Sequence, residues 1–263
     1  MKQKLVFLDI DGTILDQDDV IYDSTREALD LARKNGHRLF LCTGREKYAV
    51  YSGVMDLGFS DGVFAIGAHV ICDGKTVRHT PFTNEMYLKA VEVLKRHHYM
   101  YDLEANDKVY AYEVMREPLP YFWEWLTSGP YEIVERDPER LDNLDKISFL
   151  GGDCPPMELL KELGPEFHIS PFVYRNVWQG GEIQRKGVNK AYGIQAALDY
   201  LGADIADTIA VGDSMNDLEM LSYCKNSIAM GNATDYVKSK ASYVARNIKD
   251  DGLYWAFKDF GLI

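Results

Sequence analysis

The chain has few cysteines, and the four that it contains are far apart in the sequence. No two of them form a Cys-x-x-Cys pair, a spacing that is typical of zinc ligands and of redox-active thiols. Disulfide frameworks are typical of small secreted domains that are rich in cysteine. The sequence therefore predicts neither a zinc centre nor a disulfide framework for Cys42, Cys72, Cys154 and Cys224.

Positive charge is also scarce. The 263 residues include 29 Lys and Arg against 41 Asp and Glu, which gives a formal net charge of −12. Nucleic acids and anionic membranes are bound through basic surfaces, so we expect neither as a partner. No apolar run approaches the ~20 residues of a membrane span, and no basic and apolar leader precedes the first predicted strand. We therefore expect a cytoplasmic protein that meets an anionic substrate with a few local cations.

Two common phosphate-binding loops are missing from the chain. It contains no Gly-x-x-x-x-Gly-Lys-Ser/Thr, and no Gly-x-Gly-x-x-Gly follows a predicted strand. Both motifs cradle phosphates with a glycine-rich loop at the start of a helix. If the protein acts on phosphate, it must do so with other groups.

The most informative stretch lies near the start of the chain. Four apolar residues, 5–8, lead into Asp9, Ile10, Asp11 and Gly12. A short continuous apolar run before a glycine is typical of a buried parallel strand, and ligands bind at the carboxyl ends of such strands. A strand that ends in a simple Asp-Gly turn is the alternative for this motif taken alone, since short motifs need structural context.

Two further apolar runs end in polar residues. Residues 208–211 lead into Gly212 and Asp213, with Asn216 and Asp217 close behind, and residues 38–42 lead into Thr43-Gly44-Arg45. The helices expected between these strands imply a parallel sheet with right-handed crossovers. The strand ends then meet at one edge of the sheet, which argues against the simple-turn alternative.

A predicted helix over residues 187–201 supplies a cation. Its apolar residues recur at helical spacing, and Lys190 lies in its first turn. Lys186, just before the helix, could supply this cation instead, although a solvated surface charge is the simpler interpretation of Lys186.

These segments resemble the haloacid dehalogenase superfamily of phosphoryl-transfer enzymes, and their order and spacing resemble its Cof-type branch. The matching segments are residues 9–13, 43–45, 186–190 and 212–217. The resemblance implies an α/β fold, with a Rossmann-like doubly wound parallel sheet as core and an inserted α+β cap domain. We expect the core over residues 1–82 and 183–263 and the cap over residues 83–182.

The resemblance also implies catalytic roles. Asp9 is expected to be the nucleophile that forms an aspartyl-phosphate, and Asp11 the general acid and base. Thr43 is expected to donate its hydroxyl to the phosphoryl group, and Lys190 to neutralise charge on Asp9 and on the phosphoryl oxygens. Superfamily pumps that keep their aspartyl-phosphate have Thr where this chain has Asp11, which favours a phosphatase.

A carboxylate that attacks an anionic phosphate needs its charge balanced, and Mg²⁺ fits because it binds hard oxygen ligands. The expected metal-site residues are Asp9, Asp11 through its main-chain carbonyl, Asp213 and Asp217. The expected substrate-binding residues are Gly12, Gly44, Arg45 and Asn216. For Arg45, an exposed arginine at a helix start is nearly as good an interpretation.

The middle of the chain carries weaker signals. A helix is expected over residues 46–56 and a hairpin over residues 69–78, with Asp73-Gly74 as its turn. Cap strands are expected over residues 99–104, 108–114, 131–135, 146–150, 166–169 and 173–178, and cap helices over 84–98, 121–126 and 156–163. The cap is expected to choose the leaving group, and the side chains that could face substrate are Glu104, Tyr112, Arg175 and Trp178.

The sequence thus predicts a Mg²⁺-dependent phosphatase of a small phosphorylated metabolite. Sugar phosphates are the leading substrate class, with pyridoxal phosphate and nucleotides as runners-up. We expect a monomer or a weak homodimer. The alternatives are a phosphomutase of the same superfamily and a metabolite-binding regulator without catalytic activity.

Overall fold

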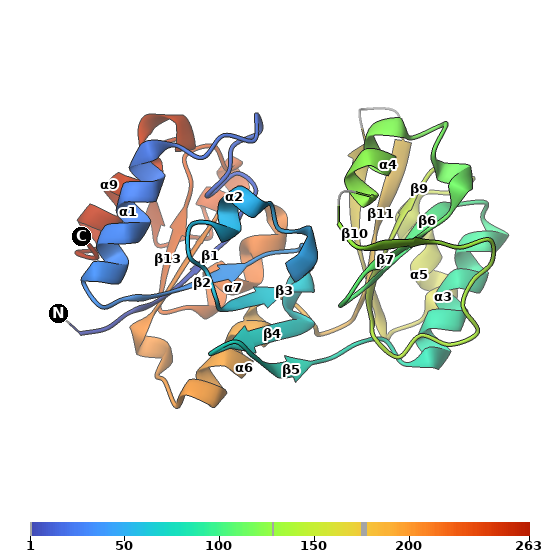
Figure 1. The fold of residues 1–263 in the computed structure, drawn as a ribbon, viewed down its shortest axis with the longest axis horizontal. Coiled ribbons are helices and arrows are strands. Elements are labelled where there is room, and N and C mark those ends of the chain that lie inside the picture. Colours follow the sequence, from blue (N-terminus) through green and yellow to red (C-terminus); the bar gives the residue numbers. More distant parts are fainter. Residues whose placement is uncertain (1, 128, 175–177) are drawn as a thin grey trace. The chain divides into compact units, whose positions relative to one another are not determined.

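The computed structural model describes residues 2–127, 129–174 and 178–263, which form two compact units (Figure 1). Unit 1 comprises Met1–Arg45, Val50–His79 and Asn189–Ile263, and unit 2 comprises Glu46–Ala49 and Thr80–Val188. Unit 1 contains the motif segments 9–13, 43–45 and 212–217 together with Asn189 and Lys190, and unit 2 is inserted into its sequence.

Unit 1 is built on an eight-stranded sheet. Its strands are β1 (Leu5–Leu8), β2 (Arg38–Cys42), β3 (Gly62–Phe64), β4 (His69–Cys72), β5 (Lys75–His79), β12 (Thr208–Gly212), β13 (Asn226–Ala229) and β14 (Tyr243–Val244). The spatial order is β14-β13-β12-β1-β2-β3-β4-β5, and the pairs from β14 to β3 are parallel. The antiparallel β4–β5 hairpin closes one edge, as the sequence predicted.

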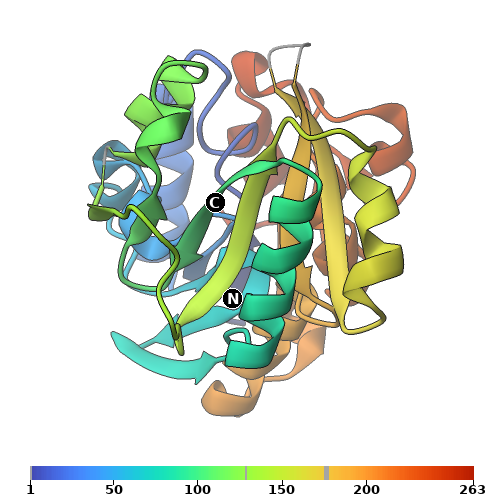
Figure 2. The same cartoon turned by 90° about the vertical axis from the view of Figure 1, so that its right-hand side faces the viewer.

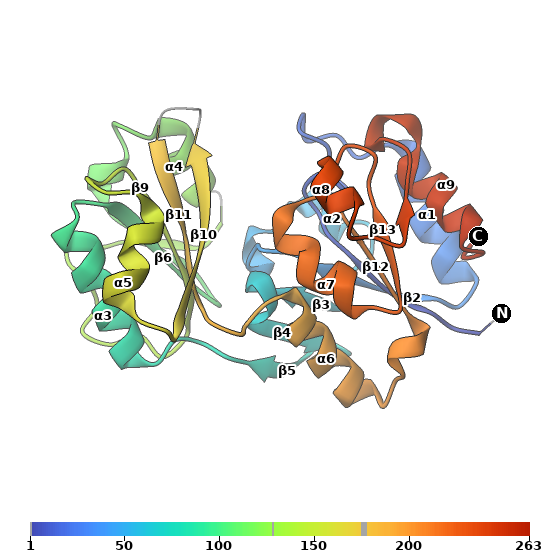
Figure 3. The same ribbon diagram turned by 180° about the vertical axis from the view of Figure 1, so that it is seen from behind.

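Helices cover both faces of this sheet, which makes it doubly wound. The helices of unit 1 are α1 (Asp23–Lys34), α2 (Ser52–Met55), α6 (Lys190–Leu201), α7 (Leu218–Tyr223), α8 (Asp235–Lys238) and α9 (Gly252–Asp259). One apolar cluster joins the sheet to α1, α2 and α9, and a second joins it to α6, α7 and α8, the side seen in Figure 3. Because both faces are buried, the strands read as continuous apolar runs rather than as alternating patterns.

Unit 2 is an α+β domain built on a six-stranded sheet. Its strands, in spatial order, are β10 (Phe167–Tyr174), β11 (Trp178–Arg185), β9 (Leu144–Leu150), β6 (Met100–Ala105), β7 (Val109–Ala111) and β8 (Tyr131–Ile133). All pairs are antiparallel except β7 with β8. The helices α3 (Asn84–Arg96) and α5 (Leu160–Leu163) pack on one face of this sheet (Figure 2), and a third helix, α4 (Pro120–Leu126), follows β7.

The structure corrects two sequence-based predictions. The helix expected over residues 46–56 is a 3₁₀ turn, Lys47–Ala49, followed by the one-turn α2; Gly53 within it weakens helix formation. Where strands were expected over 166–169 and 173–178, residues 167–174 form one continuous strand, β10, which includes Pro171. Residues 175–177 lie outside the described residues, and Trp178 begins β11. Proline lacks the N–H that a central strand donates, but β10 is an edge strand and tolerates it.

Within the described residues, no helix is both long enough and apolar enough to cross a membrane.

Candidate active site

The loop that follows β1 carries the two aspartates of the first motif. The Asp9 main-chain N–H donates to the Val211 carbonyl at 2.9 Å, which extends the pairing of β1 with β12 by one residue. The Asp9 carboxylate is buried, whereas the Asp11 side chain is 51% exposed. The sheet therefore holds the first carboxylate inside the site and leaves the second at its surface.

The cation of the site comes from the first turn of α6. The Lys190 side chain is fully buried, and its Nζ donates to Asp9 Oδ1 at 2.7 Å and to Asp217 Oδ1 at 2.6 Å. Asn189 caps this helix through its side chain and so fixes where the helix begins. Lys186, the rival in the sequence, is exposed and belongs to unit 2. The structure therefore places Lys190 between the aspartates.

The loop after β12 carries the second pair of carboxylates. The Asp217 side chain is fully buried, and its Oδ2 accepts the main-chain N–H groups of Asp213 and Ser214, each at 2.9 Å. Its Oδ1 accepts from Lys190, so donors occupy both oxygens of Asp217. Carboxylate oxygens of Asp9, Asp213 and Asp217 all lie within 4.8 Å of one another. Two strand ends, those of β1 and β12, and the start of α6 thus converge on one acidic group.

Burial and mutual repulsion decide the protonation of this acidic group. Burial, and then the charge of Asp217, raise the pKa of Asp9 well above its usual value, against the opposing effect of Lys190. The same two causes raise the pKa of Asp213 to about 7. Burial alone would lower the pKa of Lys190, but Asp217 and Asp9 outweigh it, so this pKa is raised and the ammonium stays protonated. Three carboxylates share one ammonium, and negative charge is left over.

The chemistry of this donor set fits Mg²⁺. Mg²⁺ takes oxygen ligands and is usually held by one or two protein carboxylates together with substrate oxygens and waters. Lys190 takes one of the two lone pairs of Asp9 Oδ1, so this oxygen can also bind a cation. The neighbouring Asp213 carboxylate can bind the same cation. Asp217 already accepts hydrogen bonds from Lys190, from two main-chain N–H groups and from the Ser214 hydroxyl, so it is better suited to hold these groups than to bind a cation directly.

Gly12 is required by the close approach of two loops. Its φ is +86°, and a Cβ added to it would lie 2.1 Å from Asp213 Oδ2. Both the left-handed backbone and the contact exclude a larger residue. Gly12 therefore lets the loop after β1 lie against the loop after β12.

The loop after β2 brings further polar groups to the same edge of the sheet. Thr43 is buried, and its N–H donates to the Val63 carbonyl at 2.9 Å. Its Oγ1 accepts the Arg45 main-chain N–H at 3.1 Å, so its own proton can be donated to a substrate oxygen. Gly44 lies beside Asn216, because a Cβ on Gly44 would be 3.7 Å from Asn216 Nδ2.

Arg45 makes a contact that the sequence did not predict. Its Nε and Nη2 donate to the two carboxylate oxygens of Asp11, each at 2.8 Å. Its guanidinium also lies over the Tyr51 ring, 4.4 Å from the centroid, and its side chain is only 15% exposed. The interpretation of Arg45 as an exposed arginine at a helix start is therefore wrong.

Sequence reasoning missed Asn232. This residue lies beyond β13, and its Nδ2 donates to the Gly12 carbonyl at 2.8 Å and to Asp213 Oδ2 at 3.4 Å. Its Oδ1 accepts the Ile248 N–H at 3.1 Å, which fixes the orientation of the amide. The available signal was position alone: Asn232 follows the parallel strand next to β12, at the edge where the other site residues lie.

The four cap residues singled out in the sequence have different surroundings. Glu104 on β6 accepts from the Ser148 hydroxyl at 2.6 Å and pairs with Lys146 Nζ at 3.1 Å. The Tyr112 hydroxyl donates to Asp137, an interaction within unit 2. Arg175 and the side chain of Trp178 lie outside the described residues.

Comparisons with known proteins agree with this geometry. Residues 6–257 match the family model of haloacid dehalogenase-like hydrolases. The chain is 27% identical over its full length, and over the full length of that relative, to YkrA of Bacillus subtilis strain 168, whose name gives a phosphatase activity as provisional. It is 26% identical to a 5-amino-6-(5-phospho-D-ribitylamino)uracil phosphatase, YcsE, of the same organism, with 98% of this chain and 96% of the relative covered.

Two further similarities are informative. The pyridoxal phosphate phosphatase YbhA of Escherichia coli strain K12 is 26% identical, with 96% of this chain and 97% of YbhA covered. The solved structure of BT4131, a sugar phosphatase of haloacid dehalogenase subclass IIB, superposes with a TM-score of 0.83 at 24% identity and covers 99% of this chain and all of BT4131. At that identity the superposition bears on the fold, and it confirms the predicted α/β core.

Proposed function

Because the chain belongs to the haloacid dehalogenase-like hydrolases and is a phosphoric monoester hydrolase, we propose that it is a Mg²⁺-dependent phosphatase that works through an aspartyl-phosphate on Asp9. Its proposed substrates are small phosphorylated metabolites, with sugar phosphates as the leading class. The proposal makes residues 1–82 and 183–263 the catalytic core and residues 83–182 a cap that selects the leaving group.

One observation carries the proposal, namely the position of Lys190 between Asp9 and Asp217. Its Nζ occupies Asp9 Oδ1, which leaves Oδ2 as the oxygen that can attack phosphorus. A lysine so deeply buried needs paired carboxylates, and a purely structural pair would not need a third carboxylate, Asp213, within 4.8 Å. The excess negative charge suits a site that binds a divalent cation and then an anionic substrate.

The chain's own residues account for the proton and bond changes. Asp9 Oδ2 attacks phosphorus and forms an acyl-phosphate as the P–O bond to the leaving group breaks, and Asp11 gives its proton to the leaving oxygen. In the second half, Asp11 takes a proton from a water whose oxygen attacks phosphorus, and Asp9 is released together with inorganic phosphate. Thr43 and the Gly44 N–H donate to phosphoryl oxygens, beside Asn216.

Asp9, Asp213 and the Asp11 main-chain carbonyl are the proposed Mg²⁺ ligands, with Asp217 behind them. When bound, Mg²⁺ would supply positive charge against the carboxylates and the phosphoryl oxygens. Gly12 and Asn232 support this group, because Gly12 permits the close approach of the two loops and Asn232 ties its carbonyl to Asp213.

The substrate class is supported by the acidic composition and by the relatives. A net charge of −12 favours no nucleic acid or anionic membrane as a partner and is compatible with a small anionic substrate held by local cations. Relatives carry names for phosphatases of a phosphoribityl compound, of pyridoxal phosphate and of sugar phosphates. We propose a cytoplasmic monomer or weak homodimer.

Phosphate release from a panel of phosphomonoesters tests the proposal, measured with Mg²⁺ and with EDTA. We expect release that requires Mg²⁺, is strongest for a sugar phosphate, and is abolished in Asp9→Asn. Asp56→Asn is a matched control, because Asp56 is an exposed carboxylate at the end of α2. Release that survives Asp9→Asn would overturn the assignment of the nucleophile, and release unaffected by EDTA would overturn the role of the metal.

A further inference from the structure

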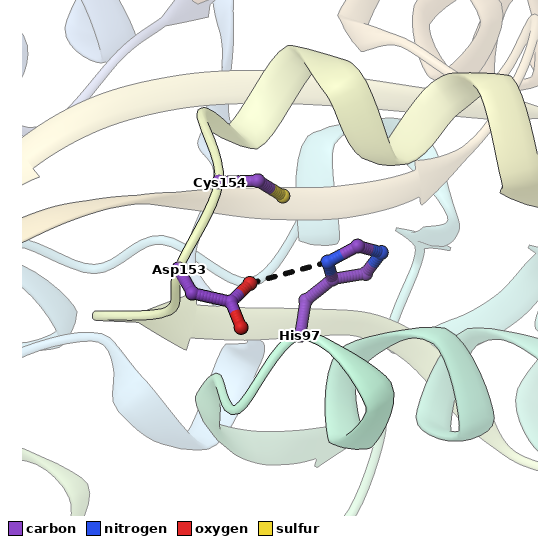
Figure 4. Close-up of side chains that lie close together, drawn as sticks. All are labelled: His97, Asp153 and Cys154. Carbon is purple, nitrogen blue, oxygen red and sulfur yellow. Dashed lines mark hydrogen bonds and ion pairs between the residues drawn. The ribbon is translucent and has the colours of Figure 1, made fainter.

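A second group of metal-binding side chains lies in unit 2, far along the sequence from the candidate active site. His97 follows the C-terminus of α3, and Asp153 and Cys154 lie in the turn that precedes the 3₁₀ segment Pro156–Leu159. One ligand atom from each of the three lies within 4.8 Å of the others. Figure 4 shows the Cys154 sulfur and an Asp153 oxygen directed toward the side of the His97 ring that carries Nδ1.

The backbone holds these ligands together. The Asp153 main-chain N–H donates to the His97 carbonyl at 3.1 Å, and the Tyr99 hydroxyl donates to the Cys154 carbonyl. Gly152 has a φ of +88°, and a Cβ on it would lie 2.5 Å from the Tyr99 ring. A glycine is thus required for the turn that delivers Asp153 and Cys154, and the cluster does not depend on a mobile surface side chain alone.

A carboxylate outside the cluster orients the histidine. His97 Nε2 lies 2.6 Å from Glu162 Oε1, and His97 Nδ1 lies 3.2 Å from Asp153 Oδ1. When Nε2–H donates to Glu162, the Nδ1 of the neutral ring faces the Asp153 carboxylate, and a metal ion can bind between the two atoms. A histidine whose second nitrogen donates to a carboxylate is the usual arrangement of a metal ligand.

We propose that His97, Asp153 and Cys154 form a zinc-binding site, with Glu162 as the residue that orients His97. One nitrogen, one oxygen and one sulfur ligand suit Zn²⁺ and exclude Mg²⁺, which binds oxygen. Asp153 is exposed and the other two ligands are partly exposed, so the fourth position is open to water. The second oxygen of Asp153, Oδ2, lies 2.9 Å from His98 Nδ1.

This site differs from the candidate active site in its ligands and in its expected effect. The Asp9, Asp213 and Asp217 group contains no sulfur or nitrogen ligand, so the two sites select different ions. The zinc site joins the end of α3 to the turn before α5, and both helices pack on the sheet of unit 2. Zinc that binds only the folded form stabilises that form by mass action.

Absorption with Co²⁺ as a stand-in for Zn²⁺ tests the proposal on the full-length protein, with excess Mg²⁺ present for the acidic group of unit 1. We expect a near-ultraviolet thiolate-to-cobalt band at one Co²⁺ per chain, displaced by Zn²⁺. The band is expected to vanish in Cys154→Ser and to weaken in Asp153→Asn and His97→Ala. His168→Ala, at an exposed histidine of the same unit, and Cys72→Ser are the matched controls and should keep it.

Two results would overturn the proposal. No thiolate band in the wild type would mean that the cluster is only a set of ion pairs between His97 and its acidic neighbours. A band that persists in Cys154→Ser would place the metal on another cysteine. As a second readout, Zn²⁺ should raise the melting temperature of the wild type and not that of Cys154→Ser, while both proteins release phosphate at the same rate.

Discussion

The guanidinium of Arg45 and the carboxylate of Asp11 form a bidentate ion pair, with both N–O distances at 2.8 Å. Such paired hydrogen bonds fix the orientation of both groups. In this pair the arginine holds the proposed general acid and base, and not a phosphate. Arg45 is thus a candidate positioning residue that aims Asp11 at the leaving oxygen.

Arg45→Ala should therefore lower kcat more than it raises KM. The loss should be about tenfold for an alkyl phosphate, a fraction of what general acid catalysis contributes, and smaller for p-nitrophenyl phosphate, whose leaving group needs little protonation. Steady-state kinetics with both substrates measure the difference. Arg33→Ala is the control, because Arg33 on α1 also packs over an aromatic ring, that of Phe59, but contacts none of the described residues of the candidate active site. An equal rise in KM for both substrates at unchanged kcat would instead make Arg45 a phosphate ligand, as the sequence suggested.

Removal of the buried ammonium should damage both activity and stability. Lys190→Met leaves Asp9 and Asp217 buried without their counter-charge, and breaking a buried pair in this way costs about 3–5 kcal/mol. The loss of a preorganised cation should also lower kcat by at least about 10²-fold. Urea unfolding and phosphate release measure the two effects. Lys186→Met, at the exposed rival, should change neither, and equal effects of the two substitutions would refute the assignment.

Replacement of Asn232 should weaken the binding of Mg²⁺. Asn232→Ala removes the donor to the Gly12 carbonyl and to Asp213, and the loss of such supporting hydrogen bonds typically weakens metal binding about 10–100-fold. The Mg²⁺ concentration that gives half-maximal activity should rise accordingly, while kcat at saturating Mg²⁺ changes less. Asn35→Ala removes a similar amide bond, to the Leu262 carbonyl, away from the site. If both variants need the same Mg²⁺ as the wild type, Asn232 has no part in the site.

Much of the core could be predicted from the sequence because each motif follows a buried strand. A continuous apolar run such as residues 5–8 or 208–211 indicates a strand covered on both faces, and parallel order then brings the ends of the runs to one edge. The positions of Asp9, Asp213 and Lys190 in the structure follow from that topology and from the start of α6.

Other features depend on contacts that local sequence does not encode. Asn232 reaches Gly12 across 220 residues, and nothing in the residues around it marks that partner. The pair of Arg45 with Asp11 depends on how two loops meet. Residues 170–172 were expected to separate two strands, whereas β10 runs through them, because its edge position in the sheet tolerates Pro171. The turn with Asp153 and Cys154 comes 56 residues after His97, so no ligand spacing revealed the cluster.

Alanine substitutions at two glycines can separate the cost of backbone strain from the cost of a steric contact. Gly12 and Gly36 both have a φ of +86°, but a Cβ on Gly12 meets Asp213 at 2.1 Å, whereas a Cβ on Gly36 meets nothing within 4 Å. Gly36→Ala should lower the free energy of unfolding only by the backbone strain of a left-handed alanine, about 1–2 kcal/mol. The variant should keep its activity. Gly12→Ala should cost more and lose Mg²⁺-dependent phosphate release. Urea unfolding and activity assays of the pair check this, and full activity in Gly12→Ala would show that the two loops can separate freely.

The folded protein should lose stability below neutral pH through His37. This side chain is buried, its Nδ1 accepts the Lys4 N–H at 3.1 Å, and burial lowers its pKa below the usual value. The unfolded chain then takes up a proton first as the pH falls below about 6.5. The contribution of His37 is therefore fully present above that pH and is lost as the pH drops toward the folded-state pKa.

His37→Asn keeps an acceptor for the Lys4 N–H and removes the titration. The difference in unfolding free energy between wild type and variant, measured in urea at pH 7.5 and 5.5, should therefore shift in favour of the variant at the lower pH. The same comparison with His168→Ala, at an exposed histidine of unit 2, is the control and should show no such shift. A difference that does not change with pH would mean that water reaches His37 and that its proton is gained equally in both states.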